Sequence, residues 1–193
     1  MQFEEAGQFI MHKLATELPD NLTYHCTDHT IDVYNAAQAI AKSEGVDGHD
    51  LQLLLTAAWF HDAGFIISAT NHEEGSCGIA RHFLPAFGYT NTDIESICGM
   101  IMATRIPQSP ANLLEQIIAD ADLDYLGRDD FFMIGDKLYE ELTIAGVVAN
   151  ETDWNNLQVR FLQSHHYFTQ TAIASRQAKK EQHLQQIKAK LAP

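Results

Sequence analysis

The spacing of apolar residues constrains this chain most, because they recur at helical intervals along almost its whole length. No stretch rich in Val, Ile and Thr alternates with polar residues between hairpin turns, as β-strands would require. The sequence therefore predicts an all-α fold. The segment Leu51–Phe60 is too uniformly apolar for a surface helix, so we expect it at the centre of the fold.

Proline, glycine and capping residues divide the chain into predicted helices. Thr92–Glu95 fits a capping box, and Ser109-Pro110 fits an N-cap followed by proline at the first helical position. No Ser/Gly/Pro linker is long enough to separate domains, so we expect one domain over residues 1–193. The other predicted helices cover about 2–18, 28–44, 71–88, 129–147 and 152–190, the last of them open to interruption.

Charge and cysteine content narrow the class of protein. The 193 residues include 26 acidic and 12 basic side chains, a formal net charge of −14. Such a charge repels nucleic-acid backbones and acidic membrane surfaces, so we expect no nucleic-acid polymer and no membrane as partner. The three cysteines form no Cys-x-x-Cys pair, and the N-terminal residues lack the charge order of a signal peptide. We therefore expect a cytoplasmic protein.

The C-terminal end differs in charge from the rest of the chain. One interpretation of its basic residues is a solvated helical face. The other is a docking surface for the acidic body of a second subunit, which would give a homodimer. The last eighteen positions hold five of the twelve basic residues, namely Arg176, Lys179, Lys180, Lys188 and Lys190.

Two segments place metal-ligating side chains at helix ends. His25 and His29 are four residues apart, so on a helix they share one face, where they either point into one pocket or have a structural role. His61 and Asp62 end the most apolar predicted helix, where they would be costly to bury unpaired, and metal coordination satisfies both. Adjacent helical side chains diverge by about 100°, so we expect Gly64 to loosen the helix and let both reach one ion.

A third segment carries Asp120, Asp122 and Asp124, alternating with apolar residues late in a predicted helix. Acidic residues near a helix C-terminus oppose the helix dipole. Capping of the following turn explains one of these carboxylates, and a bound cation explains more than one.

In this order, the three segments resemble those of the HD superfamily of metal-dependent phosphohydrolases. The resemblance covers about residues 20–130, and helices over about 129–190 would complete the HD-type helical bundle. The residues Tyr24-His25-x-x-x-His29-x-x-Asp32-Val33 look like the opening motif of the cyclic-nucleotide phosphodiesterase branch. Ala121-Asp122-Leu123 resembles the final ligand segment of that branch.

The resemblance implies a metal site and a reaction. His29, His61, Asp62 and Asp122 would be the metal ligands, with Asp62 also counted as catalytic, and His25 would donate a proton to the leaving oxygen. Asp120 is also preceded by alanine, so it is an alternative to Asp122 as the last metal ligand. The implied reaction is hydrolysis of a phosphodiester or phosphomonoester of a nucleotide or another small phosphorylated metabolite by a metal-activated water. Such ligands suit Mn, Fe, Co, Ni or Zn.

Substrate-binding residues are predicted next to this site. His72 and Glu73 resemble the His-Glu helix that faces the pocket in small bacterial members of the superfamily, and we place Asp120 on the substrate side as well. Many two-metal relatives carry histidines just after the position of Thr104, where this chain has Arg105, so we expect one metal per chain. Arg105 either clamps a phosphate or forms a surface salt bridge.

Two other functional classes fit the same motifs. A non-catalytic regulatory or sensor module could keep the fold and bind a nucleotide or a metal. A di-iron oxygenase on a related scaffold would need second-site histidines that this sequence lacks.

Overall fold

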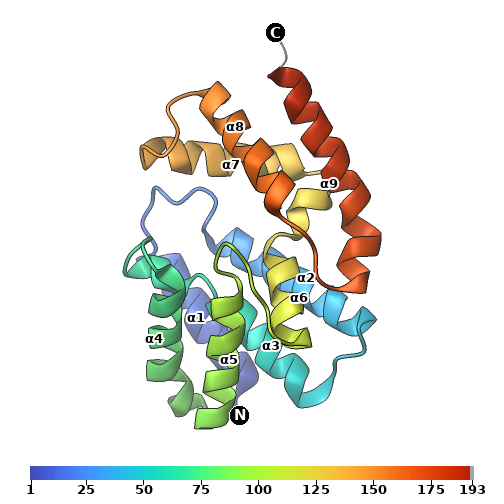
Figure 1. Cartoon of the computed structure of the whole chain (residues 1–193). Helices are drawn as coiled ribbons and strands as arrows, with labels where there is room; N and C mark the ends of the chain where they lie inside the picture. Colours follow the sequence, from blue (N-terminus) through green and yellow to red (C-terminus); the bar gives the residue numbers. More distant parts are fainter. Residues whose placement is uncertain (192–193) are drawn as a thin grey trace.

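The chain is a bundle of α-helices linked by turns and short 3-10 segments (Figure 1). The structure, a computed structural model, describes residues 1–191, and within that range it contains no β-strand. The all-α prediction is confirmed. The elements are α1 (Phe3–Glu17), α2 (Thr27–Ser43), α3 (Gly48–Phe60), η1 (Ala63–Ile66), α4 (His72–Phe83), η2 (Leu84–Phe87), α5 (Asn91–Ala103), α6 (Leu113–Asp122), η3 (Asp124–Gly127), α7 (Phe131–Ile144), α8 (Glu151–Ser164) and α9 (Gln170–Lys190).

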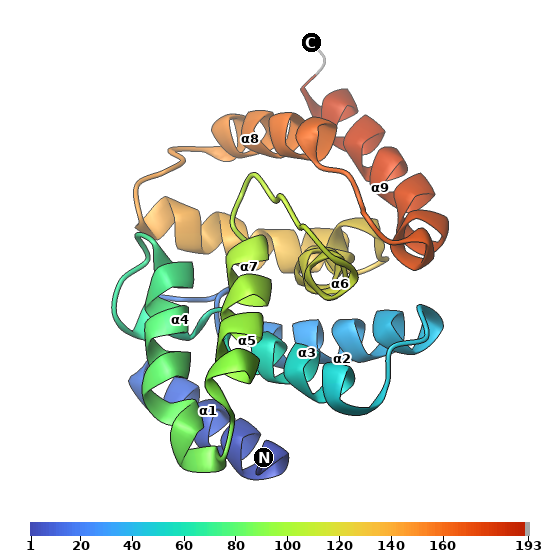
Figure 2. The ribbon, with the colours of Figure 1, turned by 60° about the horizontal axis from the view of Figure 1, so that its bottom comes forward.

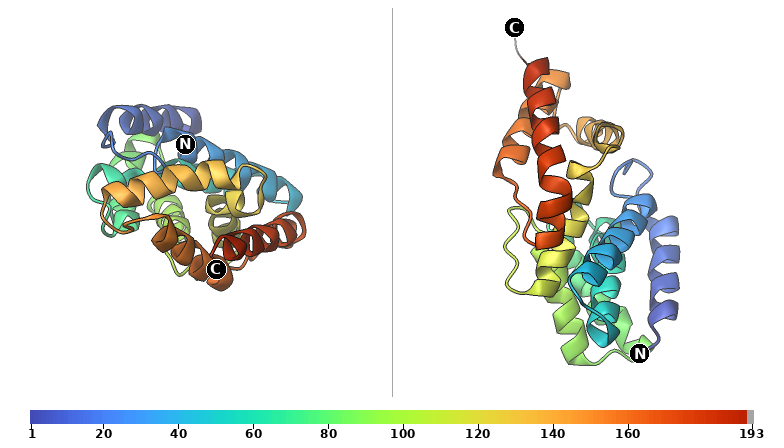
Figure 3. Two further views of the ribbon diagram at one scale, coloured as in Figure 1. Left: turned by 90° about the horizontal axis from the view of Figure 1, so that it is seen from above. Right: turned by 90° about the vertical axis from the view of Figure 1, so that its right-hand side faces the viewer.

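The helices form two parts with separate apolar cores. Helices α1 to α6 enclose the larger core, and α7, α8 and α9 lie together on one side of them (Figures 1 and 3). The smaller core joins Tyr24 and η3 to Phe131 of α7, Leu162 of α8 and Ile187 of α9. The boundary between the two parts is where the candidate site lies.

Helix α3 occupies the centre of the larger part. Its residues Leu53, Leu54, Leu55 and Phe60 are buried, and it packs against α1, α2, α5 and α6. Burying a leucine or phenylalanine side chain stabilises the fold by roughly 1.5–3 kcal/mol. The predicted central position of this segment is therefore confirmed, and α3 gives its C-terminal residues a rigid support.

Helix α5 begins slightly earlier than predicted. The Thr90 hydroxyl accepts a hydrogen bond from the Asp93 backbone N–H at 3.2 Å, and the Asp93 carboxylate accepts one from the Thr90 N–H at 2.9 Å. The capping box therefore starts at Thr90, and the prediction that it spans Thr92–Glu95 is wrong. The box forms here because the Thr90 and Asp93 side chains together satisfy two N–H groups that would otherwise lack partners.

Helix α6 begins later than predicted. The Asn112 side chain accepts a hydrogen bond from the Glu115 N–H at 3.1 Å, and the Glu115 carboxylate accepts one from the Ala111 N–H at 2.6 Å. These paired bonds set the start of the helix, so Ser109-Pro110 lies in the preceding loop and the predicted cap there is wrong. The α5–α6 loop passes close to α7 and α8 and supplies Ile106 to the pocket they share (Figure 2).

The C-terminal region consists of two helices, because the predicted stretch over 152–190 is interrupted between α8 and α9. Three of its five basic side chains have partners within the chain. Arg176 pairs with Asp124, Lys179 pairs with Asp129, and the buried Lys180 donates to the His165 carbonyl at 2.6 Å. Both the docking surface and the homodimer stay predictions. Within residues 1–191, no helix has both the length and the apolarity needed to cross a membrane.

Candidate metal centre and adjoining pocket

Four predicted ligands converge from three parts of the chain. His29 lies in the first turn of α2, His61 and Asp62 directly follow α3, and Asp122 ends α6. His29 Nε2 lies 3.1 Å from Asp122 Oδ1 and 3.3 Å from His61 Nε2. Asp62 Oδ2 lies 3.2 Å from His61 Nε2 and 3.5 Å from His29 Nε2. His29, His61 and Asp122 therefore form one compact donor group, and Asp62 lies against its two histidines.

The chemistry and spacing of these donors fit a transition metal. Neighbouring ligand atoms around an ion with bonds of about 2.1 Å are roughly 3.0–3.4 Å apart, close to the distances between these atoms. His61 donates from Nδ1 to the Ala58 carbonyl at 2.9 Å, which leaves the lone pair of Nε2 directed at the cluster. The donor atoms of His29, His61 and Asp122 all lie within 4.8 Å of one another. Mixed imidazole and carboxylate donors suit a divalent transition metal.

The electrostatics of the cluster reflect this concentration of acid groups. Burial lowers the pKa of His61, but the Asp62 and Asp122 carboxylates outweigh it and raise that pKa well above its usual value. Burial raises the pKa of Asp122, but hydrogen bonds from His29 and His61 lower it to about 2. The cluster therefore attracts positive charge, and a metal ion would compete with protons for the histidine nitrogens.

The backbone after α3 explains how two adjacent residues face one point. Asp62 leaves helical geometry, with φ −103° and ψ 7°, and the chain continues into the 3-10 turn η1. The helix therefore loosens where predicted, and Gly64 within η1 also lies against α4. A Cβ added there would lie 1.9 Å from the His72 carbonyl oxygen. The Ser76 hydroxyl joins the two segments, since it donates to the His61 carbonyl at 2.6 Å and accepts from the Gly64 N–H at 2.8 Å.

His25 faces the pocket next to the cluster, with Glu141 of α7 behind it. His25 Nδ1 forms a short hydrogen bond to the Glu141 carboxylate. That carboxylate also accepts hydrogen bonds from the backbone N–H groups of Tyr24, at 2.9 Å, and of His25, at 3.0 Å. Burial lowers the pKa of His25, but the Glu141 hydrogen bond and nearby acids raise it overall. Glu141 lies 116 residues from His25 and belongs to no sequence motif, so its role could not be predicted from the sequence.

His72 joins this arrangement through an aromatic stack. Phe65 of η1 stacks on both His25 and His72, with ring centroids 4.2 Å apart in each pair, and the centroids of the two histidine rings are 6.2 Å apart. His72 Nε2 lies 3.5 Å from Asp62 Oδ1 and 3.5 Å from Glu73 Oε1. His25 and His72 both line the pocket, and their roles as proton donor and substrate-binding residue stay predictions.

Arg105 forms salt bridges with neighbouring acids. Its guanidinium lies 3.1 Å from Glu73 Oε2 and also pairs with Glu74. Glu73 and the adjacent Thr104 line the pocket, whereas Arg105 is not among its lining residues. Of the two predicted roles for Arg105, the structure therefore shows the salt bridge.

Asp120 is directed away from the pocket, so its predicted contact with substrate is wrong. Its carboxylate accepts hydrogen bonds from the Phe168 N–H at 2.9 Å, the Thr169 N–H at 2.7 Å and the Thr169 hydroxyl at 2.7 Å. Two residues along a helix rotate a side chain by about 200°, so Asp120 and Asp122 point in nearly opposite directions. Asp122 is the one that reaches the cluster.

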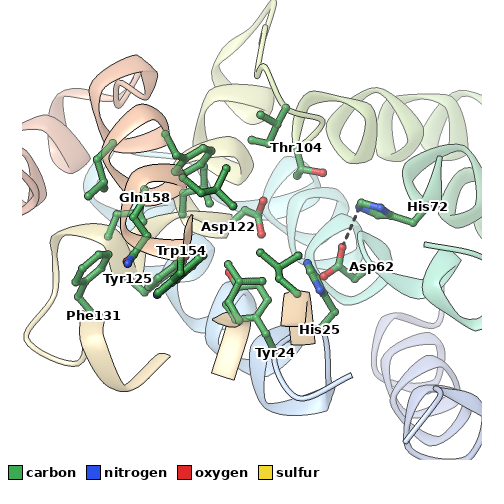
Figure 4. A pocket seen from close by; sticks show the side chains of 18 of the residues that line it. Tyr24, His25, Asp62, His72, Thr104, Asp122, Tyr125, Phe131, Trp154 and Gln158 are labelled. Atoms are coloured by element: carbon green, nitrogen blue, oxygen red, sulfur yellow. Dashed lines mark ion pairs between the residues drawn. The ribbon is translucent and has the colours of Figure 1, made fainter. Parts of the chain in front are cut away.

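One pocket of about 280 Å³ adjoins the cluster and extends toward α7 and α8. In Figure 4, Asp62 and His72 stand at one end, Asp122 lies near the middle, and Tyr125, Phe131 and Gln158 stand at the other end. The residues around Asp122 carry the acids and histidines, whereas those on α7 and α8 are mostly apolar. The pocket therefore has a polar end and an apolar end.

Comparisons with known proteins agree with this fold. The similar solved structures include a predicted HD superfamily hydrolase from an uncultured Thermotogales bacterium, with 22% sequence identity, a TM-score of 0.60 and coverage of 98% of this chain and 92% of that one. A Lactobacillus plantarum protein has 20% identity, a TM-score of 0.66 and coverage of 99% of both chains. Bacillus subtilis YpgQ in complex with ADP has 16% identity, a TM-score of 0.65 and coverage of 98% of this chain and 97% of that one. No curated protein matches the chain.

A family comparison covers the segment that holds the cluster. The family model described as HD domain matches residues 27–124, a range that begins at α2 and ends just after α6. His29, His61, Asp62 and Asp122 all lie inside this range. The chain belongs to the HD domain family.

Proposed function

We propose that this protein is a metal-dependent hydrolase of phosphate esters, whose substrate is a nucleotide or another small phosphorylated metabolite. The observation that carries the proposal is the convergence of His29, His61, Asp62 and Asp122 beside a pocket that His25 also lines. A ligand set and a proton donor at one end of a pocket are the parts that hydrolysis of a phosphate ester requires.

His29, His61, Asp62 and Asp122 would hold the ion. A bound divalent metal would lower the pKa of a coordinated water and offset the charge of the phosphate. The carboxylates of Asp62 and Asp122 would balance its charge, and the Ala58 carbonyl holds the His61 ring in the tautomer that ligation needs. The polar end of the pocket would thus receive the phosphate.

His25 would protonate the leaving oxygen. A general acid must carry its proton at the working pH, and Glu141 favours the protonated imidazole by raising the pKa of His25. The stack on Phe65 and the Glu141 hydrogen bond fix the ring in one orientation. His72, which also stacks on Phe65, would donate a hydrogen bond to a phosphate oxygen.

The first experiment is the elemental metal content of the purified protein, measured by mass spectrometry beside a folded Asp62→Ala variant. We expect about one transition metal per chain, lost in the variant, because Asp62 is one of four proposed ligands. A content of about two ions would contradict the single-metal prediction.

The second experiment measures phosphate release from phosphomonoesters and phosphodiesters with Mn, Fe, Co, Ni or Zn. We expect His25→Ala to slow hydrolysis of alkyl esters by about 10²-fold or more, and that of nitrophenyl esters much less, because nitrophenolate leaves without a proton. A metal-loaded protein that hydrolyses no member of the panel would contradict the proposal and favour a non-catalytic module.

A further inference from the structure

The pocket continues past the catalytic residues into a space that the proposed chemistry does not use. We call this space the apolar chamber. It is lined by Phe131, Leu138, Leu142, Trp154, Leu157 and Phe161. Figure 4 shows the labelled members Phe131 and Trp154 on the side of Asp122 that faces away from Asp62 and His72. A molecule with its phosphate at the metal centre would therefore direct its organic part into this chamber.

The charges around the pocket limit how much phosphate it can hold. None of the described residues that line it is a lysine or an arginine, and three of them, Asp62, Glu73 and Asp122, are acidic. The nearby Arg105 is already paired with Glu73 and Glu74. Beyond one metal ion and two histidines, nothing in the pocket would neutralise the second or third phosphate of a polyphosphate. The arrangement thus favours a single phosphate group.

The size and chemistry of the chamber indicate what kind of group is attached to this single phosphate. Aromatic and aliphatic side chains from α7 and α8 form its walls, and the Gln158 amide adds one uncharged polar group. A cavity of about 150 Å³ lined by apolar side chains binds benzene, and this whole pocket measures about 280 Å³. It therefore has room for a phosphate together with one aromatic ring or a short alkyl chain, and burial of such a group in apolar surroundings is favourable.

We infer that the substrate of this site carries a single phosphate on an apolar organic group, alkyl or aryl, with the phosphate at the metal centre and the organic group in the apolar chamber. This inference rests on the proposed function, because it assigns the phosphate to the proposed metal centre. It narrows the substrate from any phosphorylated metabolite to monophosphate esters with a hydrophobic substituent.

The test is the affinity of the Mn²⁺-loaded protein for alkylphosphonates from methyl to hexyl, measured by calorimetry. Phosphonates cannot be hydrolysed, so binding is measured separately from turnover. We expect each added CH₂ group to tighten binding by about fourfold until the chamber is full. Equal affinity along the series, absence of binding, or tighter binding of ADP than of hexylphosphonate would overturn the inference.

Two variants locate the binding of the alkyl chain. Leu157→Trp fills part of the chamber with an indole ring, so we expect it to flatten the dependence of affinity on chain length. Asn156→Ala is the matched control, because Asn156 is the exposed neighbour on the same helix, and we expect the wild-type dependence there. Leu138→Trp repeats the test from α7 in case the first variant does not fold. Wild-type dependence in both folded tryptophan variants would overturn the inference.

Hydrolysis of the matching alkyl phosphates separates this inference from the proposed function. If affinity rises with chain length but no phosphate is released, the proposed hydrolysis is wrong, and the chamber is a binding site for monophosphates with an apolar substituent. If nucleotides are hydrolysed while affinity stays constant along the alkyl series, the proposed function stands and the inference fails.

Discussion

At the scale of single residues, Glu141 shows how a side chain outside any motif can control the chemistry of one inside it. Its carboxylate forms a hydrogen bond with the His25 ring and also accepts hydrogen bonds from the backbone N–H groups of Tyr24 and His25. Glu141 therefore fixes both the position of the proposed proton donor and the loop that carries it. Its effect on the pKa of His25 can be separated from its structural effect by a conservative substitution.

We predict that Glu141→Gln moves the alkaline limb of the pH–rate profile to lower pH. The hydrogen bond to Glu141 raises the pKa of His25 above its ordinary value, so the wild-type acid keeps its proton to higher pH. A neutral amide removes that support. The same sign holds for stability, because a raised histidine pKa stabilises the fold below about pH 6.5, and this contribution is lost as pH rises through the folded-state pKa.

The control for this substitution is Glu140→Gln, at an exposed neighbouring position on α7. It removes the same charge without touching His25, so its pH profile should match that of the wild type. An unchanged profile in Glu141→Gln would show that this carboxylate does not tune His25.

Asp120 and Asp122 have different roles although they lie two residues apart. We predict that Asp122→Ala loses bound metal while its thermal unfolding stays cooperative, because it removes a proposed ligand. Asp120→Ala should keep the metal but lose about 2–3 kcal/mol of unfolding free energy, because two backbone N–H groups near the start of α9 lose their acceptor. Metal content and denaturant unfolding of both variants check this, and a metal-free Asp120→Ala would reverse the assignment.

At the scale of elements, the contact between η1 and α4 sets the geometry of the polar end of the pocket. Gly64 lets the turn approach α4 so closely that the Ser76 hydroxyl can bond to both the His61 carbonyl and the Gly64 N–H. Through this contact, the residues that follow α3 and the first residue of α4, His72, are held at fixed positions.

We predict that Gly64→Ala destabilises the protein by about 1–3 kcal/mol, because the new methyl group would meet the His72 backbone carbonyl. Gly78→Ala is the matched control on α4. An added Cβ there has nothing within 4 Å, so it should stabilise the helix by about 0.5–1 kcal/mol. Denaturant unfolding of both variants measures the difference, and equal stabilities would contradict the close contact described for Gly64.

At the scale of the whole molecule, the metal cluster joins segments that are far apart in the sequence. His29 and Asp122 lie 93 residues apart, and His61 comes from the end of the central helix α3. An ion bound by these residues would therefore hold α2, α3 and α6 together in the larger part of the fold.

We predict that metal stabilises the folded chain against heat. Saturation at about 100 times the dissociation constant adds about 2.7 kcal/mol to the unfolding free energy, because the ion binds the folded site and not the unfolded chain. Calorimetry with and without Mn²⁺ measures the rise in Tm. The Asp62→Ala variant should show little rise, and an equal rise in that variant would place the ion elsewhere.

The sequence by itself determined the all-α class, the central position of α3 and the three segments that carry the cluster. These properties depend on helical periodicity and on residues near each other in the chain, which patterns express directly. Even here, neighbouring hydrogen bonds decided the starts of α5 and α6, where Asp93 and Glu115 favoured other caps than those predicted.

Only the tertiary structure decided which acids and cations meet. It directs Asp120 to the start of α9 and Asp122 to the cluster, pairs Arg105 with Glu73, and brings Glu141 to His25. These contacts join helices that are distant in sequence, and their energies depend on how the helices pack. Local spacing carries no information about that packing, so neither the partner of His25 nor the apolar chamber between α7 and α8 could be predicted from the sequence.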